Sequence, residues 1–295
     1  MRRRFVSSIL DPDMVDPKVV QDYNEQGFGI ARGLFSREET EFFSRYFTEM
    51  LNRGGDGWAE GGVDFESSEP WRRWPRLLQP HRGDDVALGY MVDPRIREHL
   101  KTLLGEDPYA VQTMVYFKPP GATGQNLHQD NTYLMAQPGT CIAAWTALDD
   151  CDEENGCMVL VPNTQGLPVI CQVENPSLVG ECWGTVETPL PPGATVVPAI
   201  MKAGDTLFFN GSVIHGSYKN RSADRFRRTL IGHYVAAESR QVAKYYFPVY
   251  LMDGTRMDDA LAVAEGGGKC GEYLVRDGEL RVVEAGSFEE ATKAH

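Results

Sequence analysis

Residues 126–134 read NLHQDNTYL, which places His128 and Asp130 two positions apart. Residues at i and i+2 of a strand project from the same face, so an imidazole and a carboxylate there could bind one metal ion together. Because an H-x-D pair often arises by chance, a third ligand is needed before it indicates a site. His215 lies in GDTLFFNGSVIHGSYKN, after a predicted strand and turn, where it can reach the interior of a β-barrel.

Two histidines and one carboxylate that share one side of a metal ion leave its other side open. This facial arrangement suits non-haem Fe(II) and oxygen chemistry, and the ligand types alone also allow zinc. The spacing therefore predicts a metal site made by His128, Asp130 and His215.

These residues need a β framework, and the apolar pattern predicts one from about residue 108 onward. In AVQTMVYFK, residues 110–118, apolar side chains share one face of a strand with period two. The other face carries Gln112, Met114, Tyr116 and Lys118. Further short strands are predicted at CIAAWTAL, CMVLVP, DTLFFN and RTLIGHYV. Many short strands separated by turn signals are typical of a jelly roll or a related antiparallel barrel.

Helices are predicted before this region. Asp16-Pro17 is a good helix start, Ser36 and Glu39 form a capping box, and RIREHLKTLLG is a third helical segment. The tail contains a predicted hairpin, EYLVRDGELRVV, that turns at Asp277-Gly278. We expect one domain over 1–295.

Within that domain we expect three parts. They are a helical part at 1–107, a jelly-roll core at 108–238 and a C-terminal extension with the hairpin at 239–295.

Three segments resemble the phytanoyl-CoA dioxygenase family of Fe(II)/2-oxoglutarate-dependent oxygenases. They are FKPPGATGQNLHQDNTYL, AAWTALDDCDEENGCMVLVPNTQG and GDTLFFNGSVIHGSYKNRSADRFRRTLIGHYV, in the family's order and spacing. The resemblance covers roughly residues 108–238. It implies a double-stranded β-helix of the cupin-like type, an iron site and 2-oxoglutarate as cosubstrate.

Carried onto this sequence, the resemblance makes His128, Asp130 and His215 the iron ligands. It also implies an arginine on the strand after the distal histidine that holds the far carboxylate of 2-oxoglutarate. Aligning the apolar run in DRFRRTLIGHY selects Arg227, and strand alternation turns Arg228 to the opposite face. A planar guanidinium suits a carboxylate because it donates two parallel hydrogen bonds. Similar candidates for the cofactor pocket are Lys118, Gln112, Met114 and Trp145.

The implied reaction consumes O2 and 2-oxoglutarate, releases succinate and CO2, and hydroxylates an unactivated C–H bond of a small or medium-sized metabolite. Related halogenases have a small residue in place of the carboxylate ligand, so Asp130 favours hydroxylation. Two alternatives remain open. One is a cupin-like metal-dependent hydrolase or isomerase, which gives no reason for Arg227 and Lys118 to face the pocket. The other is a non-catalytic binding protein on an oxygenase fold.

Composition limits the partners. The chain has 295 residues and a formal net charge of −13, which disfavours nucleic acid and anionic membranes. We expect a small-molecule substrate, whereas the sequence does not indicate an oligomeric state. The basic start MRRRF is not followed by the apolar core of a secretory signal, so a cytoplasmic protein is expected. The six cysteines form no C-x-x-C pair and are expected to be reduced thiols.

Two further segments bear on the substrate. WRRWPRLLQPHR supplies basic side chains that could steer a carboxylate or phosphate, although a solvated basic patch is the commoner explanation. These residues are Arg72, Arg73, Arg76, His81 and Arg82. Residues 164–200 are a long insertion rich in proline and glycine, which we expect to form part of the pocket rim.

Overall fold

A computed structural model describes residues 15–264, 269–276 and 279–287. Two features discussed above lie outside these residues. One is the N-terminal segment that begins MRRRF, and the other is the Asp277-Gly278 turn of the predicted hairpin. Within the described ranges, no helix is both long enough and apolar enough to cross a bilayer.

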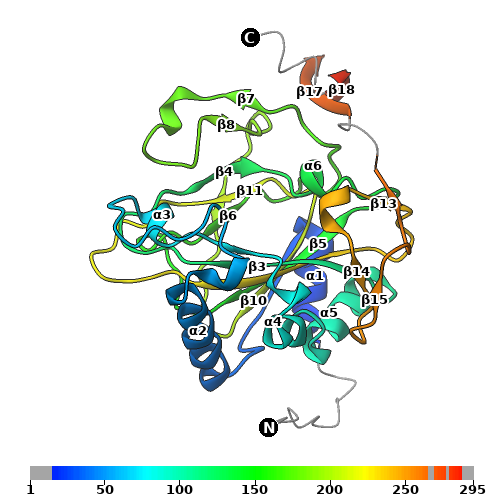
Figure 1. The fold of residues 1–295 in the computed structure, drawn as a ribbon. Coiled ribbons are helices and arrows are strands. Elements are labelled where there is room, and N and C mark those ends of the chain that lie inside the picture. The colour runs from blue at the N-terminus through cyan, green and yellow to red at the C-terminus, as the bar shows by residue number, and fades with distance from the viewer. Residues whose placement is uncertain (1–14, 265–268, 277–278, 288–295) are drawn as a thin grey trace.

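Two antiparallel sheets form the framework. The larger has eight strands: β1 (Phe28–Ala31), β10 (Thr206–Asn210), β5 (Cys141–Ala147), β12 (Thr229–Val235), β3 (Tyr109–Tyr116), β14 (Val249–Tyr250) and β15 (Arg256–Met257) in that order, with β2 (Leu77–Leu78) paired to β3. The smaller contains, in order, β4 (Gln125–His128), β11 (His215–Ser217), β6 (Met158–Leu160) and β9 (Val197–Pro198). Figure 1 shows this smaller sheet above the larger one. The fold is the expected double-stranded β-helix.

Side chains alternate along the central strands. Leu207 and Phe209 on β10 point between the two sheets, with Trp145 from the neighbouring strand β5. Phe208, between them, points to the opposite face and joins a second apolar cluster beneath the helices. Both faces of β5, β10 and β12 are therefore buried, which explains why these strands read as nearly continuous apolar runs.

Helices cover the outer face of the larger sheet (Figure 1). This layer consists of α1 (Pro17–Gln26), α2 (Arg37–Asn52), α4 (Asp85–Met91) and α5 (Pro94–Leu104), whereas the four-residue helices α3 (Pro70–Arg73) and α6 (Asn131–Leu134) lie outside it. The predicted caps are confirmed: Asp16 accepts from the amide of Lys18, and Ser36 and Glu39 form both halves of a capping box. The hydroxyl of Tyr90 on α4 lies 2.8 Å from the carbonyl of Leu230, so it ties the helix layer to the sheet.

The division into three parts needs one correction. The part expected to be helical also supplies β1 and β2 to the larger sheet, and the C-terminal extension supplies β14 and β15. Edge strands of two to four residues are too short for a period-two pattern to distinguish them from loop. These short segments form strands because their backbones hydrogen-bond to neighbouring strands of the sheet.

Three further two-stranded pairs complete the described fold. They are β7 (Val173–Glu174) with β8 (Val186–Glu187), β13 (Gln241–Val242) with β16 (Ala262–Val263), and β17 (Lys269–Arg276) with β18 (Glu279–Ser287). The last pair is the predicted hairpin. It lies at the end of the molecule away from the helices (Figure 1).

The prediction that all cysteines are reduced thiols is wrong for two of them. Cys171 and Cys270 form a disulfide, with their Cα atoms 4.9 Å apart and a separation of 99 positions in the chain. Backbone hydrogen bonds join the same two segments, because the Cys171 amide donates to Gly271. Such a pairing depends on where the hairpin docks, which spacing in the sequence does not reveal. Cys141, Cys151, Cys157 and Cys182 remain free thiols.

We predict that denatured, unreduced protein will react with about four equivalents of a thiol reagent, and with about six after reduction. The measurement is mass spectrometry of the alkylated chain, with a linked peptide pair containing Cys171 and Cys270 in the unreduced digest. Because closing a loop of this length stabilises a fold by about 2–5 kcal/mol, Cys171→Ser should lower the free energy of unfolding by a similar amount under oxidising conditions. Six reactive thiols before reduction would contradict the disulfide.

Candidate metal centre and active-site cavity

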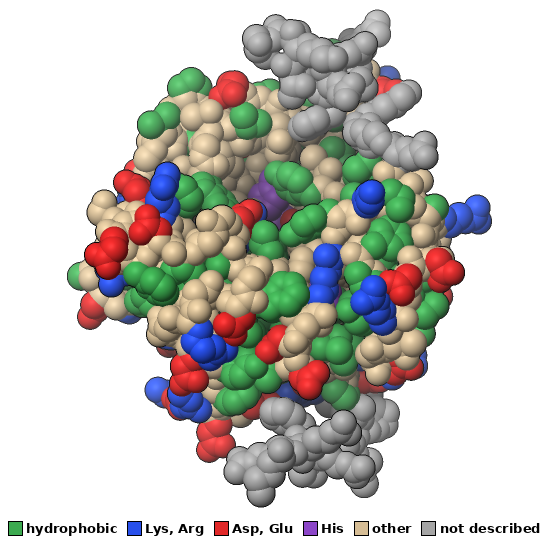
Figure 2. Space-filling view, viewed as in Figure 1, with side chains coloured by type: hydrophobic (Ala, Val, Ile, Leu, Met, Phe, Trp, Pro, Cys, Tyr) green, Lys and Arg blue, Asp and Glu red, His purple; other side chains and the backbone are tan. Residues whose placement is uncertain are grey.

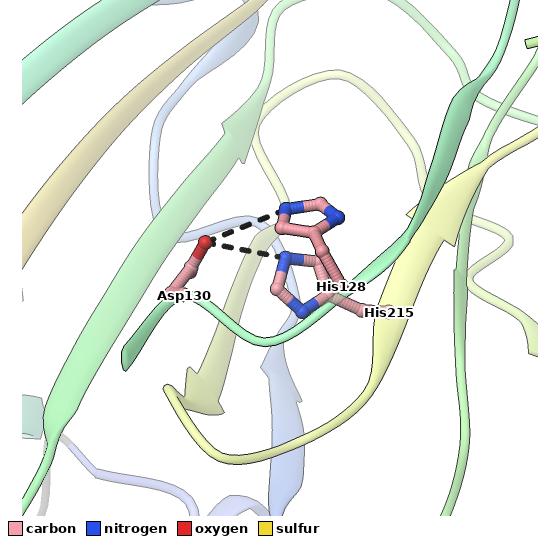
Figure 3. A group of neighbouring side chains, drawn as sticks. All are labelled: His128, Asp130 and His215. Carbon is pink, nitrogen blue, oxygen red and sulfur yellow. Dashed lines mark ion pairs between the residues drawn. The ribbon is translucent and has the colours of Figure 1, made fainter. Parts of the chain in front are cut away.

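The pairing of β4 with β11 brings the three candidate ligands together. His128, the last residue of β4, lies directly opposite His215, the first residue of β11, in the antiparallel register. Asp130 follows two residues after β4, and one of its carboxylate oxygens lies 3.5 Å from Nε2 of each histidine (Figure 3). All three side chains are buried, and one ligand atom from each lies within 4.8 Å of the others.

Hydrogen bonds fix which nitrogen of each imidazole carries the proton. Nδ1 of His128 lies 2.8 Å from the carbonyl of Asn126, and Nδ1 of His215 lies 2.9 Å from the carbonyl of Val213. Since a carbonyl only accepts, both Nδ1 atoms donate, so in the neutral imidazoles both Nε2 atoms present lone pairs toward Asp130. The Gln125 amide, 3.1 Å from Nε2 of His128, is placed to donate to that lone pair.

This arrangement fits a metal cation. Burial lowers the pKa of His215 to about 4, so its imidazole is neutral near pH 7. Burial alone would raise the pKa of Asp130, but electrostatic attraction to the imidazoles in their protonated forms and a hydrogen bond from Nε2 of His233 hold it well below its usual value, so the carboxylate is ionised. In this state the two imidazole lone pairs and the carboxylate face one point with no imidazole proton between them. A cation at this point would relieve their repulsion, and the ligand types suit Fe(II).

A fourth residue, His233 on β12, supports the carboxylate. Its Nε2 lies 3.1 Å from the second oxygen of Asp130, and its ring is buried. This contact orients the carboxylate and leaves the first oxygen to face the two histidines, as outer partners of metal ligands commonly do. We did not predict this residue from the sequence. A signal was present, because His233 lies six positions after Arg227 in an extended segment and alternation puts both side chains on the inner face.

A cavity of about 490 Å³ opens beside the three ligands. Figure 2 shows it as a hollow with histidine at its base and apolar side chains at its border. Gln112, Met114 and Trp145, proposed from the resemblance, all line this cavity. So do Trp183 and Val186 of the 164–200 insertion, as expected for a rim segment.

Arg227 and Lys118 line a second, adjoining cavity of about 270 Å³. Arg227 is buried, its Nε donates to the carbonyl of Gly156, and its guanidinium lies 5.3 Å from the Trp145 ring. Within the described chain its two terminal nitrogens make no hydrogen bond, so they are free for a ligand. The amino group of Lys118 lies 2.9 Å from Oγ of Ser217 and 2.5 Å from the carbonyl of Tyr218.

The neighbouring arginine lies on the other face of the strand, as alternation predicts. Arg228 makes a bidentate ion pair with Asp149 at 2.7 and 2.9 Å, away from both of these cavities. Arg227 therefore reaches the interior, and Arg228 does not.

The basic stretch at 71–82 does not act as one patch. Arg76 lines both cavities and pairs with Glu60, whereas Arg82 donates to the carbonyl of Tyr245. His81 is buried, and burial lowers its pKa to about 3, so it carries no positive charge near neutral pH. Only Arg76 of the five predicted basic residues borders the cavity beside the ligands.

Comparison with known proteins agrees with this geometry. The family model described as phytanoyl-CoA dioxygenase matches residues 23–229. Peroxisomal phytanoyl-CoA dioxygenase of Rattus norvegicus is 25% identical over 247 residues, which cover 79% of this chain and 72% of that protein. A probable phytanoyl-CoA dioxygenase of Caenorhabditis elegans is 32% identical over 171 residues, which cover 53% of each.

Solved structures share the fold. The non-haem α-ketoglutarate-dependent carbocyclase SnoK from nogalamycin biosynthesis has a TM-score of 0.62 and 21% identity, and the match covers 79% of this chain and 89% of that one. EctD from S. alaskensis with 2-oxoglutarate and 5-hydroxyectoine has a TM-score of 0.61 and 18% identity, covering 81% and 84%. The match of the family model to more than half of the sequence assigns the chain: it belongs to the phytanoyl-CoA dioxygenase family of iron- and 2-oxoglutarate-dependent oxygenases.

Proposed function

We propose that this oxygenase is a hydroxylase. It inserts one oxygen atom of O2 into an unactivated C–H bond of a small or medium-sized metabolite and converts 2-oxoglutarate to succinate and CO2. The observation that carries this proposal is the complete ligand set of His128, Asp130 and His215, with its lone pairs aimed into an open cavity.

The three ligands would hold Fe(II), which supplies the oxidation chemistry when bound. The protein's part is to position and enclose the reactants. Asp130, oriented by His233, occupies the coordination position that a halide would need, which favours hydroxylation over halogenation. The buried walls from β3, β5 and β12 enclose the ligands on the side of the larger sheet, so water reaches them through the cavity mouth.

Arg227 would bind the far carboxylate of 2-oxoglutarate. Its fixed Nε and its packing on Trp145 hold the guanidinium in place, and the two terminal nitrogens remain available as a bidentate donor. Lys118 lines the same cavity as a hydrogen-bond donor, and burial together with the neighbouring Arg227 holds its pKa well below the usual value. We propose that Gln112, Met114 and Trp145 form the wall between cosubstrate and substrate.

The remaining expectations are also part of this proposal. The partner is a small-molecule substrate, and the net charge of −13 argues against nucleic acid and anionic membranes as partners. We propose that residues 1–295 act as one domain. A cytoplasmic location remains a prediction, since the mammalian relatives are described as peroxisomal.

The first prediction concerns the metal. Removing one of three ligands should weaken Fe(II) binding by about 100-fold or more, so His128→Ala should lose metal and 2-oxoglutarate turnover. Iron content by mass spectrometry and succinate formation measure these effects. A circular dichroism melt of the metal-free variant checks that the fold is kept. Unchanged iron content and turnover would exclude this site.

The second prediction compares adjacent arginines. Loss of a buried, charged partner costs about 2 kcal/mol or more, so Arg227→Ala should raise the KM for 2-oxoglutarate by about 30-fold or more. Arg228→Ala loses only a half-buried ion pair with Asp149 and should change this KM by less than about 5-fold. The reverse ranking would show that Arg228 is the anchor.

The third prediction concerns the product. Incubation of candidate metabolites with Fe(II), 2-oxoglutarate and labelled oxygen gas should give products that gain one labelled oxygen, with an equal amount of succinate. Solved structures of the same fold include an epimerase and a carbocyclase, so product mass decides the outcome. A chlorinated product in chloride, or conversion without oxygen, would contradict hydroxylation. Oxidation of the metabolite without gain of oxygen would support the iron- and 2-oxoglutarate-dependent oxidation but contradict hydroxylation as its outcome.

A further inference from the structure

A paired carboxylate and guanidinium stand between the two cavities. Nε and Nη2 of Arg76 donate to the carboxylate of Glu60 at 2.6 and 2.9 Å, and Nη1 donates to the hydroxyl of Tyr116 at 3.2 Å. Glu60, Arg76 and Tyr116 line both cavities. All three guanidinium nitrogens of Arg76 are therefore engaged by the protein, and its charge is neutralised.

The other polar groups that line the larger cavity away from the ligands are mostly uncharged. The side-chain amides of Gln112 and Gln172 line it and make no hydrogen bond to other described residues. Each can donate to and accept from a ligand. These amides can satisfy hydroxyl, carbonyl or amide groups without adding charge.

The mouth of the cavity is aromatic. Tyr133, Trp183 and Tyr245 line it and keep 51%, 45% and 51% of their surface exposed. The guanidinium of Arg76 lies 4.8 Å from the Trp183 ring, which positions this rim residue above the ion pair. Figure 2 shows apolar side chains around the hollow. Exposed aromatic rings at the mouth of a pocket suit an apolar ring or chain.

We propose that the substrate is a metabolite without net charge that carries an apolar ring or chain, and that the Glu60–Arg76 pair excludes anions. An anionic group in this cavity would meet the Glu60 carboxylate and a guanidinium that is already paired. Both would oppose its binding, because its lost hydration would not be replaced by a free cation. This inference rests on the proposed function. It separates the chain from enzymes that act on acyl-CoA thioesters, whose phosphates are polyanionic.

The proposed role of the Glu60–Arg76 pair can be tested by ligand binding, without measuring turnover. Cyclohexanecarboxamide and cyclohexanecarboxylate share a ring and differ mainly in charge, and hexanoyl-CoA adds the phosphates. Dissociation constants for all three are measured by ligand-observed NMR with the metal-free full chain, saturated with succinate so that the anion site at Arg227 is already occupied. The carboxamide should bind at least about 10-fold more tightly than the carboxylate or the thioester. Trp183→Ala should weaken carboxamide binding several-fold, which places the probe at the rim.

Two variants change the pair in opposite directions. Glu60→Gln removes the negative charge and frees Arg76, so carboxylate binding should strengthen by about 10-fold while carboxamide binding changes by less than about 3-fold. Arg76→Gln leaves Glu60 unpaired and should weaken carboxylate binding further. Asp107→Asn breaks a comparably exposed pair with Arg97, outside both cavities, and should leave all constants unchanged.

Three results would overturn the proposal: equal or tighter binding of the carboxylate or the thioester, an unchanged carboxylate constant in Glu60→Gln, or no binding of either ring compound. Binding is measured without iron or 2-oxoglutarate. If no oxygenase reaction is observed, the binding result therefore still stands. If the binding prediction fails, the hydroxylase proposal is still tested by the product assay.

Discussion

The antiparallel pairing of β4 with β11 is the constraint on which the site depends. It places His128 opposite His215, and the backbone carbonyls two residues earlier in each segment take the Nδ1 protons. The two Nε2 lone pairs then converge on Asp130, which the chain reaches just after β4 ends. Shifting this pairing by one residue would turn a histidine to the other face of the sheet and destroy the ligand set.

The larger sheet supplies the side chains that surround the three candidate metal ligands. Arg227 lies two residues before β12 begins and His233 lies on β12 itself, so one stretch of chain serves the second cavity and the metal carboxylate. Its neighbours β3 and β5 add Gln112, Met114 and Trp145. Because helices cover the outer face, this sheet is buried on both sides and can hold charged groups in fixed positions. A rigid wall of this kind is a general requirement for precise binding sites.

Charge is balanced in different ways in the two cavities. Arg227 is buried with free terminal nitrogens, which is costly unless an anion binds there. Arg76 is instead paired with Glu60 and leaves no free cation at the border of the larger cavity. The first arrangement suits a dicarboxylate such as 2-oxoglutarate, and the second suits a neutral substrate. An epimerase and a carbocyclase share this fold, so the fold alone does not determine the reaction or the substrate. We therefore attribute the substrate specificity to these side chains.

The sequence by itself determined the strand core, the helix caps and the candidate ligands, because alternation, capping boxes and short motifs are local patterns. The resemblance to the family selected Arg227, and the two-residue period of a strand then placed Arg228 on the opposite face. Tertiary structure alone decided the rest. The short edge strands, the contact of His233 with Asp130, the Cys171–Cys270 disulfide and the Glu60–Arg76 pair all join segments far apart in the chain. No local pattern reports such contacts, since they form only when the sheets and the insertion pack together.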